Sequence, residues 1–258
     1  MADDEAAGPR YRRCPKCGHA PLPADQRLPA ACPACEVILA KVAAAARRPP
    51  PPRRRRQRSR RAWATLLRGS TDPVDPLVLW ARALLWAAFT VWGLRLAALD
   101  YRSGDIAGSF LHGPLLIFHE AGHVLFRLGG EWVSVLGGTL GQLLLPALLA
   151  GALLLKNRDA FGAAIGLWLL GVSLLDVAPY VYDALDPRLT LLNGETGEAG
   201  GHDWIYLLSS VGMRQRAHGL GSLVHGLGVA TLVLALGWAG WVLHGQWRRR
   251  HRPPDPPR

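Results

Sequence analysis

Long apolar runs constrain the fold of this chain more than any other feature of its sequence. Leu, Ala, Gly, Val and Trp dominate residues 77–245, whereas residues 1–75 are polar, basic and rich in Pro. A run of about 18 or more apolar residues can cross a bilayer as a helix that makes all its backbone hydrogen bonds internally. The sequence therefore predicts an α-helical polytopic membrane protein with about 5–6 transmembrane helices.

Five spans follow from the apolar runs, near residues 77–99, 110–128, 142–155, 161–184 and 222–244. The glycines of GGEWVSVLGGTLGQ, between the second and third spans, indicate a turn or re-entrant piece. Both ends of the apolar region are strongly basic, and a basic excess is typical of cytoplasmic segments. Both ends are therefore expected in the cytoplasm. This requires an even number of crossings, so residues 204–213 or the GGTLGQ region should cross as well.

All four cysteines precede the apolar runs and form two C-x-x-C pairs separated by fourteen residues, Cys14 with Cys17 and Cys32 with Cys35. Such pairs are typical of metal binding in a reducing compartment. Four thiolates can close a tetrahedral zinc site, and the metal supplies folding energy that so short a segment lacks. The spacing resembles a zinc ribbon, so we expect one structural Zn²⁺ in residues 14–41. The alternative is four free thiols in a disordered tail.

A Pro- and Arg-rich linker is expected at residues 42–75, where RRPPPPRRRRQRSRR holds nine arginines. Such a segment binds either nucleic acid or anionic lipid. An apolar span begins about fifteen residues later, so anionic lipid is the expected partner and nucleic acid is not. The domain organisation is then 1–13 disordered, 14–41 zinc ribbon, 42–75 linker, 76–245 transmembrane domain and 246–258 basic disordered tail.

Ligating side chains interrupt one apolar run, LLIFHEAGHVLF, at His119, Glu120 and His123. On a helix the two histidines project from one face about one turn apart. That spacing lets two imidazoles bind one zinc ion, with the intervening Glu beside it as a general base. Ionisable groups at membrane depth are costly and usually functional. A second, catalytic Zn²⁺ is expected here, and the alternative is a buried polar cluster that only satisfies helix contacts.

A zinc ion held by two histidines needs a third protein ligand. Asp183 follows Pro179, which should kink or unwind the fourth span and let a side chain turn inward. Asp203 follows two glycines and could approach the site, or it could simply cap a helix that begins at Trp204. The residues alone leave four candidates open, namely Asp176, Asp183, His202 and Asp203.

The combined pattern resembles the site-2 protease family of intramembrane zinc metalloproteases. That family has HExxH on one span and a Pro-containing segment ending in Leu-Asp-Gly on a later one. HEAGH at residues 119–123 and APYVYDA at residues 178–184 match these motifs, although Tyr and Ala flank the Asp of the second motif in place of Leu and Gly. The resemblance covers roughly residues 110–185. It implies hydrolysis of peptide bonds in membrane protein substrates, with Glu120 as the catalytic base and three zinc ligands, His119, His123 and Asp183.

Two functions of other classes compete with this reading. A membrane-embedded adaptor would bind metal without catalysis and recruit partners through the ribbon, but such a site has no use for a base at Glu120. A membrane-tethered nucleic-acid binder would need basic or aromatic residues in the ribbon, and residues 18–31 offer few. We expect a multi-pass protein, in a bacterial inner membrane, with its N-terminus in the cytoplasm.

Overall fold

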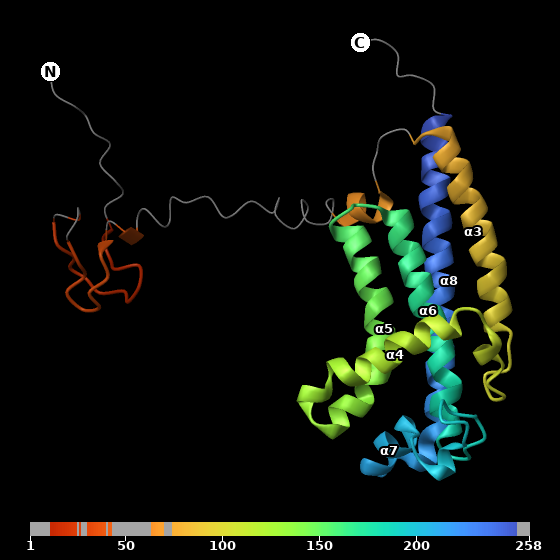
Figure 1. The fold of residues 1–258 in the computed structure, drawn as a ribbon. Coiled ribbons are helices and arrows are strands. Elements are labelled where there is room, and N and C mark those ends of the chain that lie inside the picture. Colours follow the sequence, from red (N-terminus) through yellow and green to blue (C-terminus); the bar gives the residue numbers. More distant parts are fainter. Residues whose placement is uncertain are drawn as a thin grey trace. The chain divides into compact units, whose positions relative to one another are not determined.

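The computed structural model describes residues 11–24, 26, 30–39, 41–42, 63–69 and 74–251 (Figure 1). The chain divides into two compact units, residues 1–60 and residues 61–258, and each is described by itself. The predictions of disorder before residue 14 and of an extended linker fall largely outside the described residues. Within the linker range, residues 63–68 are helical.

Two matched turns build the first unit. In each turn the N–H of the first Cys donates to a carbonyl five residues later, with N···O distances of 2.9 Å for Cys14 and 2.9 Å for Cys32. Each turn also contains one residue of positive φ, Gly18 at 75° and Glu36 at 59°. Leu39 is buried against Cys14 and Cys32. The two C-x-x-C pairs thus fold as two copies of one local structure, each presenting its thiols to the other.

The second unit is a helical bundle, and no strand occurs among its described residues. Its core surrounds α6, whose Trp168 is 1% exposed and donates from Nε1 to the carbonyl of Phe89 at 3.1 Å. Several short 3₁₀ turns connect the helices. The α-helices are α3 Pro76–Ala97, α4 His112–Leu125, α5 Glu131–Leu155, α6 Ala160–Asp183, α7 Asp203–Ser210 and α8 Ala217–Arg250.

Four helices of this part of the chain are long and apolar enough to cross a membrane: α3, α5, α6 and residues 214–250. The expected count of 5–6 was too high. The predicted second span forms α4, which has 14 residues and runs across the other helices in Figure 1. Residues 204–213 contain only the 8-residue helix α7. Four candidate spans are compatible with the expected even number of crossings.

The GGTLGQ stretch is continuous helix within α5, so the expected turn or re-entrant piece was wrong. Its glycines allow α4 and α5 to cross with their backbones in contact. A Cβ at Gly141 would lie 2.5 Å from the Phe118 carbonyl oxygen, and one at Gly137 would lie 2.8 Å from the Gly122 oxygen. Small residues let helices approach this closely, because no side chain separates the backbones. Pro179 likewise leaves α6 unbroken to Asp183.

The bundle has two distinct ends. At one end the Trp80 ring near the start of α3 packs 5.4 Å from the Trp247 ring near the end of α8. At the other end the Tyr182 ring near the end of α6 stacks 4.0 Å from the His218 ring near the start of α8. Figure 1 shows α7 at this second end. Helix α8 continues to Arg250, so residues 246–250 are not the disordered tail that the sequence predicted.

Candidate metal centres

The four cysteines converge in the first unit. Their Sγ atoms all lie within 4.8 Å of one another, with 3.7 Å between Cys14 and Cys35 and 3.7 Å between Cys17 and Cys32. Zn–S bonds of about 2.3 Å in a tetrahedron place sulfur atoms about 3.8 Å apart. The group therefore fits a closed zinc site and is compatible with the predicted ribbon. Neither of these two sulfur–sulfur distances is short enough for a disulfide bond.

The Cys14 thiol is set up to ionise. Burial raises its pKa, but hydrogen bonds from the backbone N–H groups of Cys17 and Lys16 and from the thiols of Cys17 and Cys32 together outweigh burial and lower the pKa to about 6. A thiolate, not a thiol, is the form that binds metal. The turn that positions this Cys thus also stabilises its ligating form.

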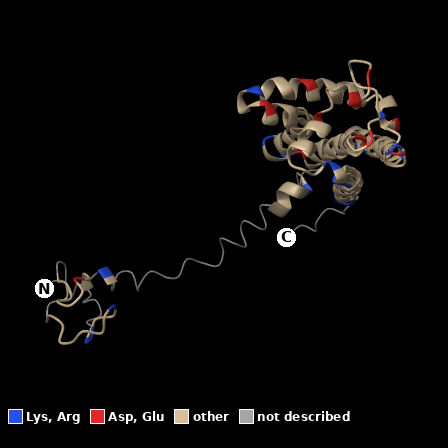
Figure 2. Ribbon diagram, turned by 90° about the horizontal axis from the view of Figure 1, so that it is seen from below, with Lys and Arg blue, Asp and Glu red and all other residues tan. Residues whose placement is uncertain are grey.

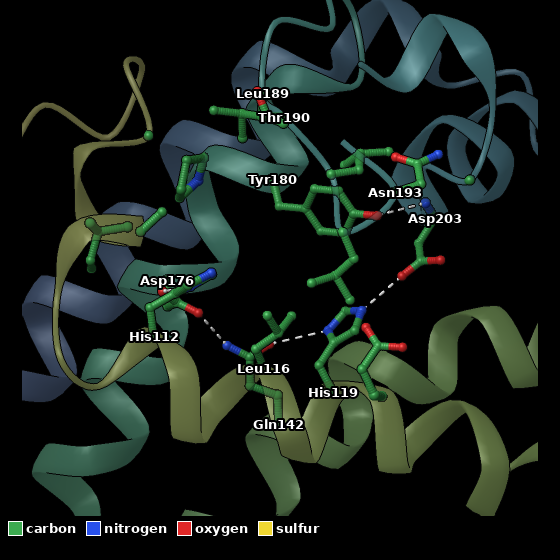
Figure 3. A pocket seen from close by; sticks show the side chains of 18 of the residues that line it. His112, Leu116, His119, Gln142, Asp176, Tyr180, Leu189, Thr190, Asn193 and Asp203 are labelled. Atoms are coloured by element: carbon green, nitrogen blue, oxygen red, sulfur yellow. Dashed lines mark hydrogen bonds and ion pairs between the residues drawn. The ribbon is translucent and has the colours of Figure 1, made fainter. Parts of the chain in front are cut away.

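The second candidate centre lies in the second unit, on α4 (Figure 3). Side-chain atoms of His119, Glu120 and His123 lie within 4.8 Å of one another and could hold a metal ion. His119 is 6% exposed. The helical spacing predicted from the sequence is confirmed, because α4 runs without a break from His112 to Leu125.

Each histidine ring is held through its Nδ1 atom. His123 Nδ1 lies 2.9 Å from the carbonyl oxygen of Ser134, which can only accept, so this nitrogen carries the proton. His119 Nδ1 lies 3.2 Å from Gln142 Oε1. The Gln142 amide is fixed in turn, because its Nε2 donates to the carboxylate of Asp176 at 2.8 Å. In both neutral rings the lone pair is therefore left on Nε2.

Asp203 completes the centre from the start of α7. Its Oδ2 lies 2.8 Å from His119 Nε2 and 3.3 Å from His123 Nε2. Two imidazole lone pairs and a carboxylate oxygen thus point at one another, and three acceptors at such distances require a cation or protons between them. Two histidines and one carboxylate are a common ligand set of catalytic zinc sites, where one position stays open.

Glycine at position 138 leaves room for an ion. A Cβ there would lie 2.5 Å from His119 Nε2 and 2.6 Å from His123 Nε2, the two atoms that carry the lone pairs. Any side chain at this position would occupy the space in front of both nitrogens. The glycine of α5 therefore has a role at the centre as well as in the helix crossing, and the donor set and the free space both fit a zinc ion.

Asp183, the predicted third ligand, is placed elsewhere. Its Oδ1 accepts from the backbone N–H groups of Arg188 at 2.7 Å and Leu189 at 3.1 Å. Its Oδ2 lies 3.3 Å from Nε2 of His202, whose side chain is fully buried and whose Nδ1 accepts from Ile205 N–H as the cap of α7. The structure brings Asp203, and not Asp183, to the two histidines. Because His202 caps α7, the Asp203 carboxylate is free to face the site.

A chain of hydrogen bonds runs outward from His119. Beyond Gln142 and Asp176 it reaches His112, whose Nδ1 lies 2.9 Å from Asp176 Oδ1. His112 is seven residues before His119 on the same helix, and its side chain is about one-third exposed. Asp176 is therefore a supporting residue of the centre. In Figure 3 the dashed lines lead from Asp176 through Gln142 and His119 to Asp203.

A cavity of about 550 Å³ opens in front of these residues. Its wall opposite α4 carries Tyr180, whose hydroxyl accepts from the Asp203 N–H at 3.0 Å. No acceptor for the Tyr180 O–H proton occurs among the described residues. The rest of the wall is mainly apolar and includes Leu116, Pro179, Leu189, Leu191 and Leu192.

Comparisons with known proteins add no assignment: no family model, no curated protein and no solved structure matches the chain. The centre therefore has to be interpreted from its own geometry. Sequence reasoning missed Ser134, Gly138 and Tyr180 as parts of it. One signal was available for Gln142, since it is a lone amide in the apolar run that continues to residue 155.

Proposed function

We propose that the protein is an intramembrane zinc metalloprotease that hydrolyses peptide bonds of membrane protein substrates. The observation that carries the proposal is the convergence of His119 Nε2, His123 Nε2 and Asp203 Oδ2 beside Glu120, at a cavity of about 550 Å³. These three atoms would hold the ion. A bound zinc ion supplies Lewis acidity, which makes water a better nucleophile and polarises a carbonyl group.

Glu120 follows His119 directly and lines the cavity. Its carboxylate lies within 4.8 Å of a ligating nitrogen of each histidine, and with Asp203 as the third ligand it is left to move protons. It is positioned to take a proton from the attacking water and return it to the leaving amine, which is general acid–base catalysis. Tyr180 lies on the facing wall with its O–H proton uncommitted. That proton can hydrogen-bond a substrate carbonyl, where negative charge develops during the attack.

The cavity lining supports a peptide substrate in a membrane setting. Its apolar residues suit hydrophobic side chains. The ionisable groups lie in the row from His112 to Asp203, and Tyr180, Thr190 and Asn193 add neutral polar groups elsewhere in the lining. A peptide bond in a membrane helix is shielded by its own hydrogen bonds, so the substrate has to enter the cavity in a locally unwound form.

Glu120→Gln tests this proposal. The amide keeps the size of the side chain but accepts no proton, so zinc binding should persist while turnover falls by about 10²- to 10⁴-fold. Glu198→Gln is the matched control, because Glu198 is exposed and does not line the cavity. Each form is co-expressed with a library of single-span membrane proteins, and fragments are compared by mass spectrometry.

Fragments produced by the wild type and Glu198→Gln, but absent with Glu120→Gln, would support proteolysis. If all three forms give the same fragments and contain the same zinc, the membrane centre has no hydrolytic role. A metal-binding adaptor that recruits partners through the four-cysteine unit would then be the better account.

A further inference from the structure

The metal centre lies nearer one end of the bundle than the other. Gly138, the α5 residue that faces Nε2 of both His119 and His123, is seven residues after Glu131, where α5 begins, and Asp176 is seven residues before Asp183, where α6 ends. At 1.5 Å per residue each distance is about 10 Å along its helix. The hydrocarbon core of a bilayer is about 30 Å thick. The centre therefore belongs to the half of the bundle that contains α7, which we call the site end.

The opposite end, which we call the basic end, is where α3 begins, α5 passes into α6, and α8 ends. Arg82 on α3 pairs with Asp159 between α5 and α6 at 3.2 Å, which ties these elements together. The sequence places nine arginines in residues 47–61, ahead of α3. Three more arginines, Arg248, Arg249 and Arg250, end α8.

The site end has a different charge balance. Its connections, residues 98–111, 126–131 and 184–216, contain five arginines and seven carboxylates. Figure 2, which views the bundle from below, shows these acidic and basic positions interspersed over several connections. Two of the arginines are already engaged: Arg188 pairs with Asp186, and Arg214 Nε donates to the Ala184 carbonyl at 2.8 Å. No concentrated basic segment occurs at this end among the described residues.

Lys and Arg near the ends of spans set the orientation of a membrane protein, because cytoplasmic segments contain more of these residues than segments on the other side. The contrast between the two ends places the basic end in the cytoplasm. We propose that the cavity opens on the other side of the membrane, and that its substrates are the unwound, non-cytoplasmic segments of membrane-anchored proteins, next to or just inside the bilayer. The substrate class in this proposal rests on the proposed protease function. The placement of the cavity on the non-cytoplasmic side rests instead on the position of the centre along the helices and on the distribution of arginines.

The cavity rim fits such a substrate. Residues 189–193 form its outer wall, and Leu192 there is 69% exposed. Leu189 also packs against Gly104 of the α3–α4 connection, where a Cβ would collide with it. A polypeptide that reaches the centre therefore passes connections of the site end before it meets Glu120. Water reaches the cavity by the same route, without crossing the apolar half of the bundle.

Single-cysteine labelling tests the sidedness without using catalysis. All four native cysteines precede residue 36, so the membrane unit is free of cysteine. Asn193→Cys places a thiol at the cavity rim, and Asn157→Cys places one at the basic end; both positions are exposed. Each full-length variant is made in a bacterial host and treated with a membrane-impermeant maleimide, before and after permeabilisation. The wild-type chain gives the background from its native thiols.

We expect Asn193→Cys to be labelled in intact cells at least about ten times more than Asn157→Cys, and both to be labelled after permeabilisation. The opposite pattern, equal labelling in intact cells, or no labelling of Asn193→Cys in intact cells would each overturn the proposed sidedness. The same two variants in a Glu120→Gln background should label identically, since topology does not depend on turnover.

The fragments from the library test the substrate class separately. With tags at both ends of each library protein, the membrane-retained product should keep its cytoplasmic tag and lose its non-cytoplasmic one. Products that lose the cytoplasmic tag would contradict the proposed substrate side while leaving proteolysis intact. Expected labelling without any Glu120-dependent fragment would instead contradict proteolysis and leave the sidedness in place.

Discussion

Replacing Gly138 by Ala should prevent metal binding at the histidine centre while leaving α5, the helix that contains Gly138, folded. A Cβ would lie 2.5 Å from His119 Nε2, whereas ordinary van der Waals contact begins at 3.4 Å. To restore ordinary contact, α5 would have to move about 0.9 Å away from the His119 side chain on α4. A zinc site tolerates deviations of only about 0.2 Å in its bond lengths. The displacement is several times that tolerance, and a shift of α5 away from α4 would break the close glycine contacts at Gly137 and Gly141.

The measurement is zinc per chain in detergent-purified protein, by plasma mass spectrometry. Gly151→Ala is the control, because Gly151 is on the same helix and a Cβ there meets nothing within 4 Å. Ala favours a helix over Gly by about 1 kcal/mol, so neither change weakens α5 through propensity. We expect about two zinc ions per chain in the wild type and the control, one for each candidate group, and about one in Gly138→Ala. Equal zinc in the two alanine variants, at equal helicity, would refute the placement of the ion.

Three further experiments examine other parts of the two centres. Asp203→Ala should lose the membrane zinc and Asp183→Ala should keep it, measured as zinc per chain; the reverse result would restore Asp183 as the ligand. Gln142→Leu should weaken zinc binding about 10- to 100-fold in competition with a chelator, because it removes the acceptor that orients an imidazole; unchanged affinity would show that this contact is dispensable. Cys14→Ser combined with Cys32→Ser should remove only the zinc of the first unit; loss of both ions would contradict two independent centres.

The parts of the molecule that sequence predicted best depend on local spacing. Helical periodicity placed His119 and His123 on one face, and the structure brings their side chains together with Glu120. The two C-x-x-C pairs fold into two similar turns whose sulfurs meet. In each case a few residues in one regular conformation determine the geometry, so one sequence is enough.

The third ligand could not be found this way, because it depends on how distant segments pack. Asp183 and Asp203 both follow sequence features that favour a polar turn, and the choice between them depends on His202 capping α7. The glycines of α5 were misread for a similar reason. Gly is typical of turns, yet here a neighbouring helix backbone requires it. Helix α4 was taken for a span because hydropathy does not reveal the direction of a helix.

The order of the site residues along the chain affects when the proposed enzyme becomes active. Asp203 stands 84 residues after His119. At a synthesis rate of about 5–20 residues per second, a nascent chain carries both histidines and Glu120 for roughly 4–17 s before that carboxylate exists. The centre is completed only after α6 has formed and α7 has docked beside it. On the proposed function, peptide hydrolysis would begin only after Asp203 has reached the two histidines, so a nascent chain that ends before α7 would not cut its neighbours.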